Sequence, residues 1–338
     1  MKIVFLNIYQ NLVDRGAETF VRELSKRLSA GHDVTVIGGD KIPAKRWPIL
    51  WRAFVDPQGV QVCWWTLTKL FKIWRERYDI VVPLNGGWQP AFVRLVTWLY
   101  GGKMVISGQA GMGWDERNNL WCFPDTFVAL STKAKKWAER VNPLVKNIYI
   151  PNGADTRKFR PDGRKLILNL SKPIFLCVGA LTKSKRIDLA INAVSRLEQG
   201  SLLVVGDGDL RREIQSLGKE LLKNRFKLIK LPYAEMPTVY RAADIFTLPS
   251  QSYQSFEVVL AEAMATGLPV VANSDAIRKE IVGDAGLLVD PTNIKEYSLS
   301  LRKALATDWN DKPRLQAKKF DWDRIVMKYE ELFNTLTE

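Results

Sequence analysis

The sequence is poor in the side chains that build metal centres and disulfide frameworks. Its 338 residues include one histidine, His32, and three isolated cysteines, an odd number. These counts fit a reducing compartment and give neither a disulfide framework nor a metal cluster. Long apolar runs are also missing, since no window reaches the roughly 18–20 residues of a membrane-spanning helix. The apolar run at residues 2–8 is too short for a signal peptide and indicates a strand, so we expect a globular, cytoplasmic protein.

Charge is plentiful, and it is mostly basic. The net charge is +14. Residues 1–150 contain 21 Lys and Arg against 12 Asp and Glu, a net of +9, and the remaining residues contain 29 against 24, a net of +5. Ten of the twelve tryptophans also lie before residue 140. A basic field attracts polyanions, so nucleic acid, anionic lipid and phosphorylated substrates are the candidate partners.

The segment at residues 41–77 is rich in both basic residues and tryptophan. It has eight basic and two acidic residues, and its basic residues are interleaved with Trp47, Trp51, Phe54, Trp64, Trp65, Phe71 and Trp74. This mixture is typical of a peripheral protein at an anionic bilayer surface, here the inner membrane face. An ordinary amphipathic helix with core aromatics fits equally well. Nucleic-acid binding is not expected, because no recognised motif is present and the basic residues are not confined to one element.

Apolar runs alternate with amphipathic stretches along the chain, which predicts an α/β fold of parallel sheets covered by helices. A strand at residues 2–8 and a helix at residues 17–30 flank a loop that contains Gly16. A second series of the same kind starts near Pro173. The chain is too long for one ordinary α/β domain. It therefore predicts two Rossmann-like domains, with a cleft at the carboxyl ends of their strands.

These patterns also give the expected domain boundaries. An N-terminal domain is predicted to span residues 1–155, and a C-terminal domain residues 173–319. A charged, turn-rich linker separates them. Residues 320–338 form an amphipathic helix whose apolar side suits packing back onto the N-terminal domain.

Two polar loops follow strands of the N-terminal half, at residues 85–89 and 108–121. Binding residues concentrate on such loops, so Asn85, Gln109 and Trp114 are candidates for ligand binding. The alternative is that these are ordinary loop residues.

The segment from Pro249 to Val271 contains the pattern that predicts chemistry. It begins as a loop after a strand and becomes a helix, with Gln254 near the helix start and Glu262 about two turns further on. The free N–H groups and positive dipole of a helix N-terminus suit a phosphate. A carboxylate beside it can bind ribose hydroxyls. Together these features predict a site for a nucleoside diphosphate.

The same residues resemble the signature of glycosyltransferase family 4, whose members have the GT-B fold. Residues 254–271, QSFEVVLAEAMATGLPVV, follow the family pattern E-[GS]-F-G-x4-E-A-M-x-x-G-x-P-V-V. Weaker resemblances to other family motifs fall in the right order at residues 151–161, 178–185, 206–208 and 244–250. The resemblance implies two Rossmann-like domains that face each other across a cleft. It also implies a retaining, metal-independent glycosyltransferase that needs no cofactor.

The resemblance further implies a role for individual residues. Lys185 would neutralise the leaving diphosphate, Gln254 would lie beside the sugar ring, and both would be catalytic. Glu262 would bind the donor ribose. The full donor-binding set is Gly16, Lys185, Gly208, Tyr233, Ser255, Phe256, Glu257, Val258 and Glu262. The donor would be a UDP- or GDP-sugar bound mainly by the C-terminal domain. The acceptor, a glycan, a lipid-linked or a small molecule, would bind mainly to the N-terminal domain. Asn85, Gln109 and Trp114 are the acceptor-side candidates, and the Trp114 ring could stack on a sugar face.

The chain departs from the family pattern at five positions. Gln254 replaces a glutamate, Glu257 a glycine, Ala180 an arginine and Arg186 a glycine, while the family's histidine has no counterpart. Lys183 or Arg186 could supply the cation that is lost. These changes leave open a weakened or inactive relative that binds nucleotide sugar without efficient transfer. A GT-B sugar-nucleotide epimerase is a further alternative. It is less favoured, because such chemistry calls for a histidine in the site.

Overall fold

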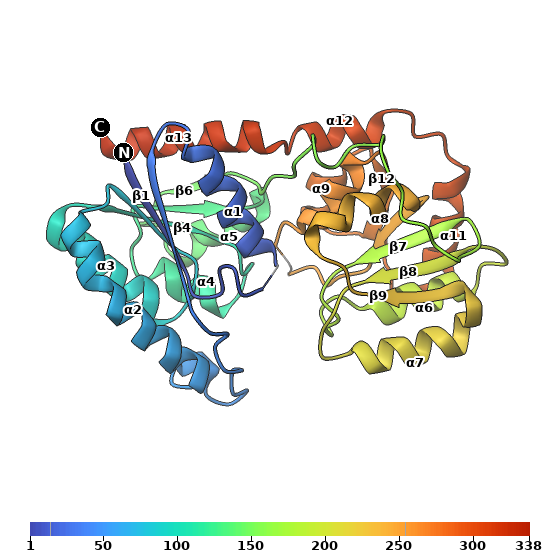
Figure 1. The fold of residues 1–338 in the computed structure, drawn as a ribbon, viewed down its shortest axis with the longest axis horizontal. Helices are drawn as coiled ribbons and strands as arrows, with labels where there is room; N and C mark the ends of the chain where they lie inside the picture. The colour runs from blue at the N-terminus through green and yellow to red at the C-terminus, as the bar shows by residue number, and fades with distance from the viewer. Residues whose placement is uncertain (14, 254) are drawn as a thin grey trace. The chain divides into compact units, whose positions relative to one another are not determined.

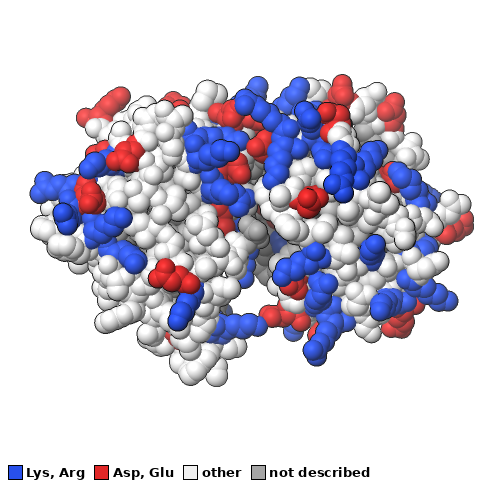
Figure 2. All heavy atoms as spheres, viewed as in Figure 1, with Lys and Arg blue, Asp and Glu red and all other residues white. Residues whose placement is uncertain are grey.

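The computed structural model describes residues 1–13, 15–253 and 255–338. The chain forms two compact units (Figure 1). Unit 1 consists of Met1–Asn152 and Trp322–Glu338, and unit 2 of Gly153–Asp321. Each unit is built around one six-stranded sheet whose paired strands are parallel, with helices between successive strands. The expectation of two Rossmann-like domains is confirmed. Basic side chains are spread over the face of both units that Figure 2 shows.

Unit 1 has the strand order β2-β1-β3-β4-β5-β6. Its strands are β1 (Lys2–Asn7), β2 (Asp33–Gly38), β3 (Ile80–Pro83), β4 (Lys103–Ser107), β5 (Thr126–Ala129) and β6 (Asn147–Tyr149). Its helices are α1 (Gly16–Leu28), the 3-10 turn η1 (Trp51–Ala53), α2 (Pro57–Glu76), α3 (Trp88–Tyr100), α4 (Trp114–Leu120), α5 (Thr132–Val141) and α13 (Trp322–Thr337).

Strand β1 is apolar on both of its sides, which explains why helices cover both faces of this sheet. Successive strand side chains point to opposite faces. Ile3 and Phe5 belong to a core cluster with α1 and α13, whereas Val4 and Leu6 belong to a second cluster with residues of α2 to α5. The C-terminal helix α13 thus packs on α1 within unit 1, where both chain termini lie (Figure 1). This helix begins at Trp322, two residues later than the sequence predicts.

Unit 2 has the strand order β12-β11-β10-β7-β8-β9. Its strands are β7 (Ile174–Val178), β8 (Ser201–Val205), β9 (Phe226–Ile229), β10 (Ile245–Leu248), β11 (Val270–Asn273) and β12 (Gly286–Val289). Its helices are α6 (Ile187–Ser195), α7 (Arg211–Leu222), the turns η2 (Lys223–Arg225) and η3 (Tyr233–Glu235), α8 (Met236–Ala242), α9 (Val258–Ala265), α10 (Ala276–Val282), α11 (Ile294–Ala306) and α12 (Lys312–Lys318).

Each sheet has a position where the strand order reverses direction. In unit 2 the chain leaves β7 toward β8 and leaves β10 toward β11, although β7 and β10 are neighbours. In unit 1 the same reversal separates β1 from β3. Loops diverge at the carboxyl ends of such strand pairs and leave a crevice, which is where open α/β sheets bind ligands.

Candidate functional site

The loops that the sequence singles out meet at the reversal point of unit 2. Residues 179–186 follow β7 and lead into α6, and residues 249–257 follow β10 and lead into α9. Gln251 N donates to Ser184 O over 2.8 Å, so the two loops are joined by a backbone hydrogen bond. The predicted catalytic residue Gln254 lies outside the described residues. The site can therefore be described from Lys185, Glu257 and Glu262.

Glu257 is the central residue of the loop before α9. Its backbone has φ +52°, a left-handed conformation at the N-cap of the helix that suits the family's glycine better than glutamate. Its carboxylate accepts from Lys185 Nζ at 2.6 Å, from Ser250 Oγ at 2.6 Å and from Arg278 Nη2 at 2.5 Å. Only 3% of this side chain is exposed. Burial alone would raise the pKa of Glu257, but Lys185 and Arg278 outweigh it and hold the pKa below its ordinary value.

Arg278 is a site residue that the sequence reasoning missed. It lies on α10, and its side chain is fully buried between Glu257 and Asp275, whose Oδ2 lies 3.3 Å from Nη1. The sequence did contain a signal for a buried arginine. Arg278 lies three residues before Ile281 and four before Val282, so it shares the apolar face of that helix. Two cations, Lys185 and Arg278, thus face two carboxylates, Glu257 and Asp275. The four formal charges sum to zero.

Glu262 lies inside α9 and is 3% exposed. Tyr233 Oη donates to its Oε1 and Tyr240 Oη to its Oε2, each over 2.8 Å. Burial and the adjacent Glu262 charge raise the pKa of Tyr240, which keeps this phenol protonated as a donor. The Phe159 ring lies against both tyrosines, with centroids 5.8 and 5.6 Å away. The carboxylate is therefore held in one orientation at the reversal point. Tyr240 is a second residue that sequence reasoning missed.

The other donor-side candidates are placed as follows. Phe256 is buried, with its ring 5.1 Å from that of Phe320, whereas Ser255 and Val258 are half-buried. Gly208 has φ +156°, and a Cβ there would lie 2.7 Å from Leu181 O, so packing within the chain already requires glycine.

Arg186, one of the two candidates for the missing cation, donates from its guanidinium to Pro249 O at 2.6 Å and to Ser250 O at 2.9 Å. These hydrogen bonds stabilise the loop after β10. Lys183, the other candidate, is exposed.

In unit 1, Gly16 and Asn85 lie after the strands that flank the reversal point. A Cβ on Gly16, the first residue of α1, would meet no atom of the described chain within 4 Å. Packing there does not explain the glycine, so an external group could approach its backbone closely. Asn85 accepts from Ile8 N at 2.9 Å and donates to Asn7 Oδ1 at 3.3 Å, which ties the ends of β1 and β3 together.

The remaining acceptor-side candidates hold neighbouring loops. Gln109 and Asn152 exchange two amide hydrogen bonds, of 3.0 and 2.8 Å. Trp114 Nε1 donates to Arg52 O at 2.9 Å, and the Arg52 guanidinium lies 5.9 Å from the Trp114 ring centroid. The indole therefore holds the η1 turn, and it is 40% exposed. A role on an acceptor stays a prediction for all three residues.

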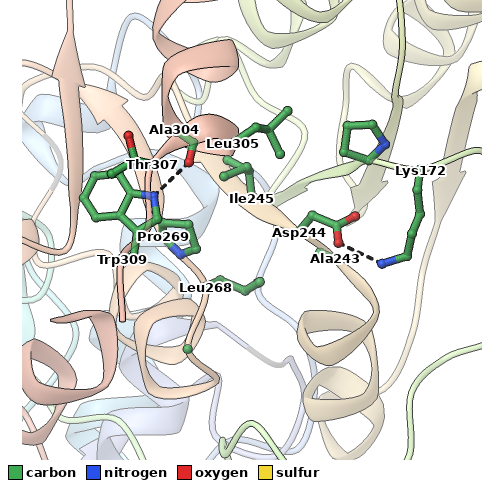
Figure 3. A pocket seen from close by; sticks show the side chains of 12 residues that line it. Lys172, Ala243, Asp244, Ile245, Leu268, Pro269, Ala304, Leu305, Thr307 and Trp309 are labelled. Carbon is green, nitrogen blue, oxygen red and sulfur yellow. Dashed lines mark hydrogen bonds and ion pairs between the residues drawn. The ribbon is translucent and has the colours of Figure 1, made fainter. Parts of the chain in front are cut away.

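A pocket of about 650 Å³ lies at the opposite, amino end of the unit 2 strands (Figure 3). Asp244 accepts there from Lys172 Nζ at 2.8 Å and from Ile174 N at 2.7 Å, so it ties β10 to the start of β7. The Trp309 indole closes another side by donating to Ala304 O. None of the predicted donor residues lines this pocket. Its contacts support a structural role for Asp244.

Comparison with known proteins gives one family match. Residues 172–307 match the family model described as Glycosyl transferases group 1. An exopolysaccharide phosphotransferase of Streptomyces coelicolor is 29% identical over 230 residues, 63% of this chain and 23% of that protein. A GDP-mannose-dependent alpha-(1-6)-phosphatidylinositol monomannoside mannosyltransferase of Mycolicibacterium smegmatis is 26% identical over 201 residues, 54% of this chain and 52% of that protein. The chain thus spans about half or less of these curated relatives.

Solved structures match over nearly the whole chain. Anabaena HepE in complex with UDP-glucose has a TM-score of 0.75 and 18% identity, covering 99% of this chain and 100% of that one. The catalytic domain of starch synthase IV from Arabidopsis thaliana, bound to ADP and acarbose, has a TM-score of 0.73 and 17% identity, with 99% of both chains covered. The expected fold class is confirmed: the chain has the GT-B fold, and its unit 2 matches the Glycosyl transferases group 1 model over residues 172–307.

Proposed function

We propose that this chain is a retaining glycosyltransferase of family 4 that transfers a sugar from a nucleoside diphosphate sugar without a metal ion. The observation that carries the proposal is Glu262, a buried carboxylate held by two tyrosines at the reversal point of unit 2. A carboxylate oxygen has more than one lone pair, so Glu262 can accept from ribose hydroxyls as well. The N-terminus of α9 starts four residues earlier and suits the diphosphate.

The names of similar proteins support the donor class. HepE was crystallised with UDP and UDP-glucose, and the mycobacterial relative is named as GDP-mannose-dependent. We propose a UDP- or GDP-sugar on unit 2. The acceptor, a glycan, a lipid-linked or a small molecule, would bind loops of unit 1 that include Asn85, Gln109 and Trp114. We place the reaction in the cytoplasm.

Lys185 is the proposed electrostatic partner of the leaving diphosphate. In the structure its ammonium group contacts Glu257. The formal charges of Lys185 and Arg278 balance those of Glu257 and Asp275. A diphosphate would therefore have to share Lys185 with Glu257 or separate the pair. Transition-state charge is stabilised best by cations that are already aimed at it, so this arrangement would lower the rate of transfer. Donor binding would then depend mainly on Glu262 and the α9 N-terminus.

The test is turnover of candidate donors by the full chain. UDP-glucose and GDP-mannose would be incubated with the protein, and release of nucleoside diphosphate measured with and without acceptor sugars. Proton NMR of the product would give its anomeric configuration. We expect release that falls at least tenfold in Lys185→Ala and is unchanged in the control Lys219→Ala, an exposed lysine on α7. Inversion of configuration would contradict the mechanism. Donor binding with no release under any condition would instead support an inactive relative.

A further inference from the structure

Helix α2 of unit 1 has an apolar stripe that faces solvent. Val60, Trp64, Leu67, Phe71 and Trp74 follow the helical spacing of 4, 3, 4 and 3 residues, so they lie along one side of the helix. All five are exposed, with Trp64 70% and Phe71 67% accessible. The opposite side, with Val62, Thr66 and Ile73, is the buried one. A helix that packs only into its own domain would expose polar residues instead.

The neighbouring helix α3 extends this surface. The two helices pack against each other. Leu95, Trp98 and Leu99 of α3 are 55%, 60% and 71% exposed, respectively. Large apolar side chains in this number form a continuous patch, and such patches on soluble domains mark sites of interaction. We call the exposed apolar residues of α2 and α3 the α2–α3 face.

The charges on these two helices are almost all basic. Lys69, Lys72 and Arg75 lie on α2. Arg94 of α3 lies with its guanidinium 4.7 Å from the Trp98 ring centroid, but it is 13% exposed and its charge is paired with Asp125, so the basic charge of this face comes from α2. Glu76 is the one acidic residue in either helix. In the view of Figure 2, the surface over α2 and α3 is largely uncoloured and is bordered mostly by blue and by a few red side chains.

We propose that the α2–α3 face docks on a membrane surface that contains anionic lipids. Tryptophan rings favour the headgroup region, and lysine and arginine beside them attract anionic headgroups. No helix of the described residues is long and apolar enough to cross a bilayer, so the chain would lie at the interface. A second copy of the chain fits less well, because a symmetric contact would bring Lys69, Lys72 and Arg75 of one face against those of the other.

The test measures binding of the full chain to vesicles without any nucleotide, so it is independent of the proposed activity. Sedimentation with phosphatidylglycerol–phosphatidylcholine vesicles is compared with phosphatidylcholine alone. We expect strong binding only with the anionic lipid, and loss of binding at high salt. Trp64→Gln with Phe71→Gln should weaken it by roughly tenfold for each ring removed. Lys72→Glu with Arg75→Glu should weaken it by at least roughly 25-fold, at about fivefold for each charge.

Matched controls make the same kinds of substitution outside the α2–α3 face. Leu144→Gln with Ile167→Gln removes two apolar side chains that are 79% and 90% exposed, and Lys133→Glu with Lys136→Glu reverses two exposed charges on α5. Both should bind as the wild type does, and circular dichroism would show that every variant is folded. No binding of the wild type to anionic vesicles overturns the proposal. So does equal loss in both control variants, or a wild-type dimer that the Trp64 and Phe71 changes dissociate.

Discussion

Replacing Glu257 by glutamine should lower the stability of unit 2 and, at the same time, strengthen binding of the donor diphosphate. The carboxylate accepts from Lys185, Ser250 and Arg278 at 2.5–2.6 Å, and 3% of the side chain is exposed, so solvent screens these contacts little. Glutamine keeps the shape but loses the charge. Arg278 would remain buried with only Asp275 as its ion-pair partner.

The expected loss of unfolding free energy in Glu257→Gln follows from the cost of breaking a buried ion pair, about 3–5 kcal/mol. For a unit of this length, each kcal/mol changes the melting temperature by about 2–4 °C. We therefore expect Glu257→Gln to melt at least about 6 °C below the wild type at pH 7, measured by differential scanning calorimetry. The exposed control Glu220→Gln should differ from the wild type by less than about 0.5 kcal/mol.

The pH dependence gives an independent check. The pKa of Glu257 is lower in the folded chain than its ordinary value of about 4.3, so the unfolded chain binds the proton more tightly. The stability from Glu257 is then fully present above that value, and it is lost as the pH falls through the folded pKa. The melting difference between wild type and Glu257→Gln should shrink as the pH falls below about 4.

Donor affinity should change in the opposite direction, because Lys185 no longer shares its charge with Glu257. We expect the Kd for UDP or GDP to fall on the order of tenfold, which is about 1.4 kcal/mol. Calorimetric titration below the melting range separates this gain from the loss of stability. An unchanged melting temperature would refute the reasoning about the buried charges. Weaker diphosphate binding would refute the competition between Glu257 and the donor.

Three further predictions concern other parts of the chain. Glu116 lies on α4, and its buried carboxylate accepts from Ala110 N and from Asn119 Nδ2, each over 3.0 Å. Burial raises the pKa of Glu116 to about 7, so the folded chain binds this proton more tightly than the unfolded chain does. The stability that this group contributes should therefore fall as the pH rises from about 4.3 to 7. The melting temperature of Glu116→Gln, measured relative to the wild type, should be higher at about pH 8 than at about pH 5. Gly16→Ala should leave the melting temperature unchanged. Gly206→Ala would place a Cβ 1.9 Å from a backbone oxygen and should prevent folding or greatly lower the melting temperature. Equal melting temperatures of the two variants would contradict this difference in packing. Tyr240→Phe removes a hydrogen bond to a buried charged group and should lower the free energy of unfolding by about 1.5–3 kcal/mol, which denaturant unfolding would detect.

The fold was predictable because local patterns determine most of it. Buried parallel strands such as β7, whose five residues are all buried, appear as continuous apolar runs, and glycine turns separate them from amphipathic helices. The order of the loops at the reversal points then follows from the connections between strands. Lys185 and Glu257 are 72 residues apart in sequence, yet their loops follow neighbouring strands.

The charge network around Glu257 was not predictable in the same way. Its glutamate replaces a glycine of the family pattern, but only tertiary structure shows that Arg278, from a different helix, neutralises it. Arg186 is a related case. Its position in sequence, next to Lys185, suggests that it binds phosphate, whereas in the structure it donates to the backbone carbonyls of Pro249 and Ser250. A sequence gives the type of a charged residue, and the fold decides which partner it meets.

The most direct test of the donor site is a thermal-shift titration of the full chain with UDP, GDP, UDP-glucose and GDP-mannose. A ligand at 100 times its Kd stabilises the folded state by about 2.7 kcal/mol. We predict that at least one of these compounds raises the melting temperature of the wild type and of the control Glu220→Gln, and that Glu262→Gln responds far less. If no compound shifts the wild type, or if Glu262→Gln responds as the wild type does, the donor site is not where this account places it.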